Sequence, residues 1–343
     1  MAYQLIAFDM DGTLLDSKKD VLPSSVAAID EALASGKDVA IASGRCPRMV
    51  LMYRDAIPHV RYAICSAGAA IVDLFEAKTL ETTEVPATAL QKVMAASHGM
   101  DKFIETTCDG EFIVPGPEME HCERYSLGVY KSLYRGQGTV LDSADAAEAF
   151  TLDPAHRIQK LNLHFTCAED RDAAIASLAG EDVNIVYCEK HSIEITHASV
   201  TKGTGLLALA AQLGIPAEET IAVGDADNDL PMLRAAGLGV AMGNANENAR
   251  QAASVTVADN DHDGCAEAIR RFLLGQPGPI RSQGCRARSR RLPRTRSARA
   301  LSPRRQRERS HVRRLTQSLP QGRACRQGTG PQAPCCQTSA RRR

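Results

Sequence analysis

The sequence predicts an α/β protein: a doubly wound parallel sheet, interrupted by an α+β insertion and followed by a disordered tail. Apolar strand-like runs alternate with helical spacing in two separate stretches, the pattern between them changes to paired strands, and the last part lacks aromatic residues. Strands that alternate with helices over short spacings are typical of a parallel sheet. We therefore expect a core built from residues 1–83 and 197–274, an insertion at 84–196 and a tail at 275–343.

The first stretch contains three short apolar runs separated by two segments with helical spacing. The runs lie at Gln4–Phe8, Asp38–Ala42 and Tyr62–Ser66, and the helical segments at Pro23–Ala34 and Pro47–Asp55. Runs of this length are too short for buried helices and fit the strands of an α/β sheet. This stretch therefore predicts the first strands of the core.

The insertion begins near Thr82, where the spacing changes. We predict strands at Lys102–Thr106, Glu111–Val114, Ile158–Phe165, Val183–Tyr187 and Ser192–Thr196, and helices at Ala87–Ser97, Glu118–Leu133 and Ala168–Leu178. Asp109-Gly110 is typical of a tight turn between antiparallel strands. The core pattern then resumes, with helices at Gly203–Leu213, Asp229–Ala235 and about 263–274 and strands at Thr220–Val223 and Leu238–Ala241.

The tail after residue 274 differs from the rest of the chain in charge. It contains 19 arginines, no lysine and one acidic residue, Glu308, whereas the preceding part is acidic. A segment with so few apolar side chains is expected to be disordered. Arginine without lysine and the abrupt start favour a functionless extension translated from a shifted reading frame. The alternative is a basic arm that binds nucleic acid without sequence specificity, since it has no aromatic residues for base stacking.

The composition also limits location and partners. No run approaches the roughly 20 apolar residues of a membrane span, so we expect no membrane partner. The N-terminus lacks the basic and apolar regions of a signal peptide, which predicts a cytoplasmic protein. The seven cysteines before residue 275 are scattered singly, as expected for buried thiols in a reducing compartment. No feature of the sequence predicts the oligomeric state.

Two acidic residues follow the first predicted strand. Asp9 and Asp11 come directly after Gln4–Phe8, and Gly12 permits a sharp turn of the backbone. The carboxyl ends of parallel strands form the edge at which such folds bind ligands. Two carboxylates this close repel each other unless a cation or a proton lies between them. Taken alone, the pattern also fits an Asx turn with two solvated acids.

Three later segments place further polar groups at the same edge. They are Ser43 and Gly44 after the second strand, Lys202 at the start of a helix, and Asp225, Asn228 and Asp229 after the strand at 220–223. A helix N-terminus with a lysine is a natural phosphate subsite. Each segment alone could be a helix cap, a surface lysine or an acidic loop. Their joint placement after successive strands predicts a site for phosphate and metal.

In the order of these four motifs the chain resembles the haloacid dehalogenase (HAD) superfamily, whose fold has a Rossmann-like core with an inserted cap. More narrowly it resembles the Cof-type sugar phosphatases. That resemblance covers residues 1–274 and rests also on Ser43-Gly44-Arg45, Asp229-Leu230-Pro231, Val240 to Ala245, and Asp263-Gly264. It implies a Mg²⁺-dependent phosphatase that acts on a small phosphorylated metabolite, with sugar phosphates as the expected class.

The resemblance also implies a role for each site residue. Asp9 would be the nucleophile and form an aspartyl-phosphate, and Asp11 would be the general acid and base. Mg²⁺ would be held by Asp9, by Asp225 and by Asp11 through its backbone carbonyl. Phosphate would be bound by Ser43, Gly44, Lys202 and Asn228, and Asp229 would support the metal ligands from further out.

The resemblance leaves the substrate open. Ala67 stands where members of the subfamily usually have asparagine, and the insertion names no specificity residue securely. His121, His164 and His191 are candidates for contacts with the substrate, although single histidines are more often surface or packed residues. A phosphomutase of the same fold is the alternative enzyme, and nucleic-acid binding through the tail is the alternative from another class.

Overall fold

The computed structural model describes residues 2–188 and 190–277. The predicted disorder and the arginines of the tail lie outside these residues. Both β-sheets that the described residues form lie in one compact unit. Within the described residues, no helix is long and apolar enough to cross a membrane.

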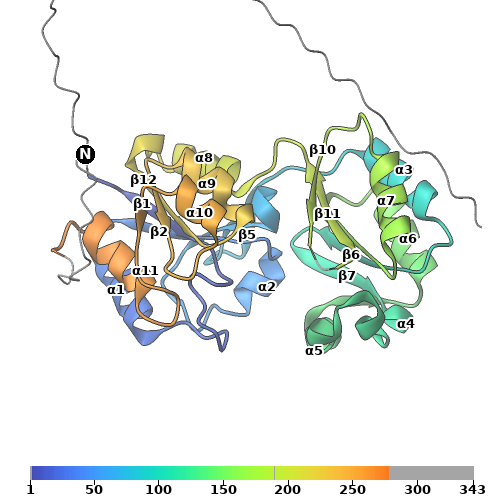
Figure 1. The fold of residues 1–343 in the computed structure, drawn as a ribbon, viewed down its shortest axis with the longest axis horizontal. Helices are drawn as coiled ribbons and strands as arrows, with labels where there is room; N and C mark the ends of the chain where they lie inside the picture. The colour runs from blue at the N-terminus through green and yellow to red at the C-terminus, as the bar shows by residue number, and fades with distance from the viewer. Residues whose placement is uncertain (1, 189, 278–343) are drawn as a thin grey trace, which may run out of the picture. The chain divides into compact units, whose positions relative to one another are not determined.

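An eight-stranded sheet forms the larger part of the fold (Figure 1). Its strands, in spatial order, are β14 (Val255–Thr256), β13 (Leu238–Ala241), β12 (Thr220–Gly224), β1 (Leu5–Phe8), β2 (Asp38–Ala42), β3 (Tyr62–Cys65), β4 (Ala70–Asp73) and β5 (Lys78–Thr82). The pairs from β14 to β3 are parallel. The last two strands are antiparallel and form an edge that the strand pattern did not predict.

Helices cover both faces of this sheet, as predicted for a doubly wound fold. On one face Ile6 and Phe8 pack with apolar residues of α1 (Pro23–Ala34) and α11 (Gly264–Ala268). On the other face Leu5 and Ala7 pack with residues of α8 (Lys202–Gln212), α9 (Leu230–Ala235) and α10 (Glu247–Ala252). Figure 1 shows α1 and α11 on one side of β1, and α8 and α9 on the other. The central strands are apolar throughout because both of their faces are buried.

A second, six-stranded sheet is built from the middle of the chain. Its spatial order is β10 (Val183–Tyr187), β11 (Ser192–His197), β9 (Ile158–Phe165), β6 (Lys102–Cys108), β7 (Glu111–Pro115) and β8 (Thr139–Leu141). All neighbours are antiparallel except β7 and β8. The predicted turn at Asp109-Gly110 joins β6 to β7, and both residues have positive φ. The predicted α+β character of this segment is therefore confirmed.

The two faces of the six-stranded sheet are covered differently. Helices α3 (Ala87–Ser97), α6 (Ala144–Leu152) and α7 (Ala168–Ser177) pack on one face through an apolar cluster. On the other face, Tyr125 and Leu127, which lie between α4 (Gly116–Met119) and α5 (Lys131–Gln137), and Tyr134 of α5 pack against β6 and β7. This second cluster leaves the polar residues of β9 and β11 outside it.

The long helix predicted at Glu118–Leu133 is wrong. The chain there forms α4, two short 3₁₀ turns (Cys122–Tyr125 and Gly128–Tyr130) and α5. Ser126 takes a left-handed conformation, with φ of 63°, that no α-helix can continue through. The predicted helix at Pro47–Asp55 is also shorter, since α2 ends at Leu51.

Hydrogen bonds join the segment after β2, which includes the start of α2 (Pro47–Leu51), to the segment that forms the six-stranded sheet. The Arg48 backbone N–H donates to the carbonyl of Gly110 at 2.9 Å. The Lys160 ammonium donates to the carbonyl of Gly44 at 2.8 Å. Cys46 and Met49 also belong to the apolar cluster that covers β6 and β7.

Candidate active site

Asp9 stands at the end of β1, in the middle of the parallel part of the sheet. Its backbone N–H donates to the carbonyl of Val223 on β12 at 3.0 Å, and its carbonyl accepts from the N–H of Leu14 at 3.1 Å. The residue is 5% exposed. The backbone is therefore fixed on both sides, and the residue is nearly buried.

Lys202 brings a positive charge to this carboxylate. It is the first residue of α8, whose N-cap Thr201 forms a capping box with Thr204. Its ammonium donates to Asp9 Oδ1 at 2.5 Å and to Asp229 Oδ1 at 2.7 Å. The lysine is 1% exposed. The cap fixes the start of the helix, and the helix start positions the ammonium.

Three carboxylates meet beside Lys202. Oxygens of Asp9, Asp225 and Asp229 all lie within 4.8 Å of one another. Asp229 Oδ2 accepts the backbone N–H groups of Asp225 and Ala226, at 2.9 and 3.1 Å. Asp225 Oδ1 accepts the hydroxyl of Thr13 at 2.8 Å. The turn after β12 thus holds its own acids in place by backbone hydrogen bonds.

The ionisation of this group reflects burial and crowding. Burial raises the pKa of Asp9 to about 7; the Lys202 charge opposes this, whereas the nearby Asp229 and Asp225 carboxylates add to it. Burial also raises the pKa of Asp225. Although burial opposes it, the charges of Asp9 and Asp229 raise the pKa of Lys202. Three carboxylates gathered this closely offer the oxygen ligands that a hard divalent cation such as Mg²⁺ prefers.

Asp11 lies in a different environment. Its carboxylate accepts a bidentate pair from Arg45, Nε to Oδ2 and Nη2 to Oδ1, both at 2.9 Å, and a third hydrogen bond from Lys19 Nζ at 2.8 Å. Partial burial alone would raise the pKa of Asp11, but the hydrogen bonds and charges of Arg45 and Lys19 lower it to about 2. Its side chain is therefore ionised and separate from the three-carboxylate group.

The remaining predicted residues lie around the same edge. Ser43, at the end of β2, is buried, and its Oγ accepts the backbone N–H of Arg45 at 3.2 Å. Gly44 follows it, and its carbonyl accepts from Lys160. Asn228 is exposed in the short turn that precedes α9.

Sequence reasoning did not select three residues that contact the predicted ones. They are Arg45 and Lys19 on Asp11, and Thr13 on Asp225. For two of these the sequence contains a signal, because Thr13 belongs to the first motif and Arg45 to the segment that begins at Ser43. No sequence motif indicates Lys19, since its contact with Asp11 depends on the path of the loop after β1.

The turn after β3 is strained. Ser66 and Ala67 both have positive φ, at 50° and 60°. This region favours glycine and asparagine over alanine. The Ala67 N–H donates to the carbonyl of Ser43, and the Ser66 N–H to the carbonyl of Arg45. The turn therefore supports the loop that carries Ser43.

Comparison with known proteins agrees with this geometry. A family profile described as haloacid dehalogenase-like hydrolase matches residues 6–269. The chain belongs to this family. The match spans both sheets and all four predicted motifs, so the family predicted from the sequence is confirmed.

Individual relatives of this hydrolase are phosphatases. It is 29% identical over 289 residues to Phosphatase YwpJ of Bacillus subtilis (strain 168), covering 79% of this chain and 100% of the relative. It is 29% identical over 282 residues to Pyridoxal phosphate phosphatase YbhA of Escherichia coli (strain K12), covering 80% and 100%. A solved haloacid dehalogenase-like hydrolase from B. subtilis matches with a TM-score of 0.67 and 28% identity, over 79% of this chain and 100% of that one. The predicted enzyme class, a phosphatase, is confirmed.

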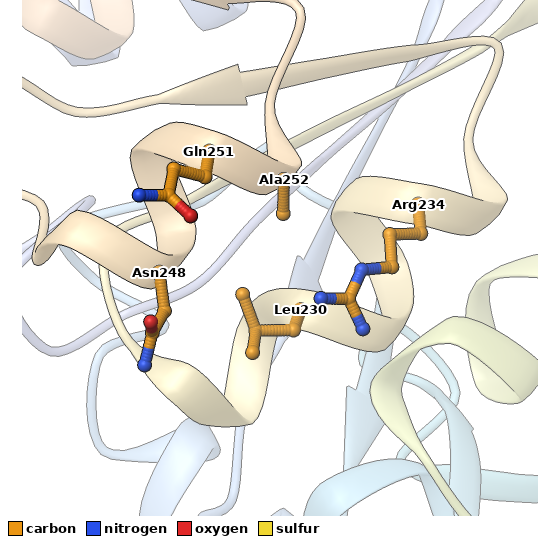
Figure 2. A pocket seen from close by; sticks show the side chains of 5 residues that line it. All are labelled: Leu230, Arg234, Asn248, Gln251 and Ala252. Atoms are coloured by element: carbon orange, nitrogen blue, oxygen red, sulfur yellow. The ribbon is translucent and has the colours of Figure 1, made fainter. Parts of the chain in front are cut away.

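A surface pocket of the hydrolase lies apart from the carboxylates. It is lined by Leu230 and Arg234 of α9 and by Asn248, Gln251 and Ala252 of α10 (Figure 2). None of these five residues carries a carboxylate or a nucleophile. The pocket therefore does not contribute to the chemistry at Asp9.

Proposed function

We propose that this hydrolase is a Mg²⁺-dependent phosphatase that takes the phosphoryl group of a small phosphorylated metabolite onto Asp9 and then transfers it to water. Sugar phosphates are the proposed substrate class. The observation that carries the proposal is the buried Asp9 carboxylate, fixed at the end of β1 and paired with the ammonium of Lys202 at 2.5 Å.

The environment of Asp9 suits a nucleophile. An attacking carboxylate must be ionised and correctly oriented, and the backbone hydrogen bonds on both sides of Asp9 help to orient it. Lys202 favours the ionised form in a buried place, because its positive charge opposes the effect of burial on the pKa. The same ammonium is placed to neutralise charge on phosphoryl oxygens during transfer, where most of the catalysis must come from.

Asp11 is the proposed proton carrier. Arg45 and Lys19 keep it ionised in the absence of substrate, which is the form that takes a proton from the attacking water in the second step. The first step needs the protonated form. We propose that the phosphoryl oxygens attract Arg45 away from Asp11, which raises the pKa of Asp11 and allows it to protonate the leaving alcohol.

The metal would be held by Asp9, Asp225 and the backbone carbonyl of Asp11, with Asp229 as the adjacent carboxylate. When bound, Mg²⁺ supplies positive charge to the phosphoryl oxygens. Ser43, Gly44 and Asn228 are proposed as the neutral phosphate contacts because they stand at the same edge of the sheet.

The insertion at residues 84–196 is proposed to act as a cap over this edge, with the core formed by residues 1–83 and 197–274. Two hydrogen bonds support this proposal. They run from Arg48 to Gly110 and from Lys160 to Gly44, and they join the insertion to the segment after β2. All three predicted histidines lie in this insertion, and His164 is the penultimate residue of β9. Burial, with the charge of Lys160, lowers its pKa to about 3, so it is a neutral side chain.

The test is phosphate release from p-nitrophenyl phosphate and from a panel of phosphorylated metabolites, with Mg²⁺, using the full chain and Asp9→Asn. The proposal expects release by the wild type and none above background by the variant. No turnover of any compound in the panel, in a protein with a cooperative thermal transition, would contradict it. Turnover that depends on a sugar bisphosphate and releases no phosphate would identify a phosphomutase instead.

A further inference from the structure

A row of polar side chains crosses the six-stranded sheet on the face opposite α3, α6 and α7. Alternation along the strands sends Leu161 and Leu163 of β9 into the helix-covered cluster, so Asn162 faces the other way. In the register of the sheet, Asn162 lies directly beside Glu105 on β6 and Glu194 on β11. The three side chains thus form one row across three neighbouring strands.

Lys160 ties this row to the active-site loop. It precedes Asn162 by two residues and so shares its face. Its ammonium donates to Glu194 Oε2 at 2.9 Å and to the carbonyl of Gly44 at 2.8 Å. Gly44 comes directly after Ser43, at the end of the strand beside β1. The proposed function places the phosphate at Asp9 and Ser43, so the leaving group of a substrate bound there would lie toward this face.

Two polar atoms on the face have no partner among the residues that the structure describes. Asn162 Oδ1 and Thr107 Oγ1 are buried and make no hydrogen bond. Thr107 lies beside Lys160 in the register, and Asn162 is 9% exposed. The orientation of the Asn162 amide follows from its neighbour, because its nitrogen faces Glu105 Oε1 at 3.4 Å. A buried acceptor without a donor is unfavourable by about 1–3 kcal/mol, unless a ligand supplies the donor.

The charges on the face limit what that ligand can be. Glu105 and Glu194 of the row are acidic and the neighbouring Lys160 is basic, so these three side chains together carry one more negative charge than positive. Carboxylate and amide oxygens accept hydrogen bonds from hydroxyl groups. A second phosphate or a carboxylate on the leaving group would meet the same oxygens and be repelled.

We propose that Asn162 and Glu194 are specificity-determining residues that bind hydroxyl groups of the leaving alcohol, with Lys160 positioning Glu194. This rests on the proposed phosphatase function. It narrows the substrate to the phosphate monoester of a neutral, polyhydroxylated alcohol and disfavours substrates with a second anionic group. Glu194 has a side chain 17% exposed, so solvent reaches the row on that side.

The chain provides a matched control for Glu194 on the opposite face of the same sheet. Lys102 pairs with Glu148 at 3.4 Å and donates to the carbonyl of Ser97 at 2.7 Å, just as Lys160 pairs with Glu194 and donates to Gly44. The Glu148 side chain is 18% exposed, close to that of Glu194. The two pairs lie on opposite sides of the sheet, since α6, which carries Glu148, packs on the side covered by α3, α6 and α7.

The experiment compares kcat/KM of Glu194→Gln, Asn162→Leu and Glu148→Gln on two substrates. One is the best polyol monophosphate of the panel, and the other is p-nitrophenyl phosphate, which has no hydroxyl group. We expect the first two variants to lose about 10- to 100-fold on the polyol phosphate and less than about 3-fold on p-nitrophenyl phosphate. Glu148→Gln should change neither value.

Stability separates recognition from a structural role. Asn162→Leu should melt close to the wild-type temperature, because leucine removes a buried acceptor that lacks a partner, and Glu105, which loses the amide donor, keeps the hydroxyl of Tyr134. Equal losses on both substrates, or no loss on either, would overturn the proposal while leaving the phosphatase function intact. A wild type that prefers bisphosphates, or phosphate monoesters whose leaving group carries no further hydroxyl, would also overturn it. A wild type that hydrolyses nothing contradicts the proposed function itself.

Discussion

The two sheets of this hydrolase both bury charged side chains, but they place them differently. In the eight-stranded sheet the charges stand at the ends of strands, where Lys202 contacts two carboxylates. Oxygens of these two and of a third carboxylate lie within 4.8 Å of one another. In the six-stranded sheet the charges stand in the middle of strands, where Lys160 contacts one carboxylate and a backbone carbonyl.

Their hydrogen bonding differs as well. The carboxylates at the strand ends are held by Lys202, by backbone N–H groups and by Thr13. On the face of the six-stranded sheet, Asn162 Oδ1 and Thr107 Oγ1 lack partners among the described residues. In the proposed reaction the first cluster acts on every substrate in the same way, whereas the second, as proposed, is completed by the hydroxyl groups of the substrate. The first should therefore control turnover of every substrate, and the second should control choice among them.

Removal of the proposed nucleophile tests this division with the largest expected effect. Asp9→Asn should lower kcat by about 10⁴-fold or more for every substrate, as loss of a nucleophile does in other covalent enzymes. The amide is neutral, and burial already favours a neutral group at this place, so the melting temperature should not fall. Steady-state phosphate release and a thermal melt test both points. A substrate-dependent loss would contradict the division.

Removal of metal should come next in size. Dialysis against a chelator should reduce turnover by about 10³-fold, because the cation supplies several kcal/mol of charge stabilisation to the reaction. Added Mg²⁺ should restore it, and Asp225→Asn should raise the Mg²⁺ concentration needed for half-maximal rate. As a control, Glu194→Gln should leave that concentration unchanged. Full activity in the presence of chelator would refute a metal role.

Lys202→Met tests the electrostatics of the first cluster. Without the ammonium, Asp9 and Asp229 face each other in a buried place, so the free energy of unfolding at neutral pH should fall by about 3–5 kcal/mol. Urea titration measures it. Mg²⁺ should recover part of the loss by replacing the positive charge. If Lys202→Met is as stable as the wild type at pH 8 without metal, the ammonium does not balance these acids.

The pH dependence of stability should carry the signature of Asp9. Its pKa is raised in the folded protein to about 7, whereas an unfolded aspartate titrates near 4, so the folded state binds the proton more tightly. The stabilising contribution is full below pH 4 and is lost as the pH rises through 7. Between pH 5 and pH 8 the metal-free enzyme should lose about 2 kcal/mol that Asp9→Asn does not lose. Identical pH profiles for the two proteins would argue against the raised pKa.

The smallest expected effect concerns the turn beside the first cluster. Ala67 has φ of 60°, which glycine adopts without strain, so Ala67→Gly should stabilise the fold by about 1 kcal/mol. Ala69, with φ of −71°, is the control, and Ala69→Gly should destabilise it. Chemical unfolding of both variants measures the change in the free energy of unfolding. A loss of stability in Ala67→Gly would show that the alanine methyl packs more favourably than the backbone is strained.

The same contrast explains what the sequence could predict. Asp9, Ser43 and Asp225 each come directly after a short apolar run, and topology alone brings such positions to one edge. Glu105, Asn162 and Glu194 are separated by more than thirty residues from one another, and each is one polar position inside an alternating strand. Their meeting depends on the register of three antiparallel strands, which the local pattern does not contain.

Other failures have local causes. The segment Glu118–Leu133 has helical spacing, but a left-handed residue at Ser126 and Gly128 divide it into short turns. The antiparallel edge β4–β5 was missed because β5 is short and largely exposed, so it lacks an apolar run. The direction of the Asp11 carboxylate also escaped prediction, because it is set by Arg45 and Lys19 through space.

The most direct test of the account is to trap the phosphorylated enzyme. Asp11→Asn should react with p-nitrophenyl phosphate, whose leaving group needs no proton, and then hydrolyse the aspartyl-phosphate slowly because it lacks the general base. Rapid acid quench and peptide mass spectrometry should find the phosphoryl group on Asp9, and on no peptide of the Asp9→Asn, Asp11→Asn double variant. A phosphoryl group on another residue, or phosphate release that persists without Asp9, would contradict the central claim.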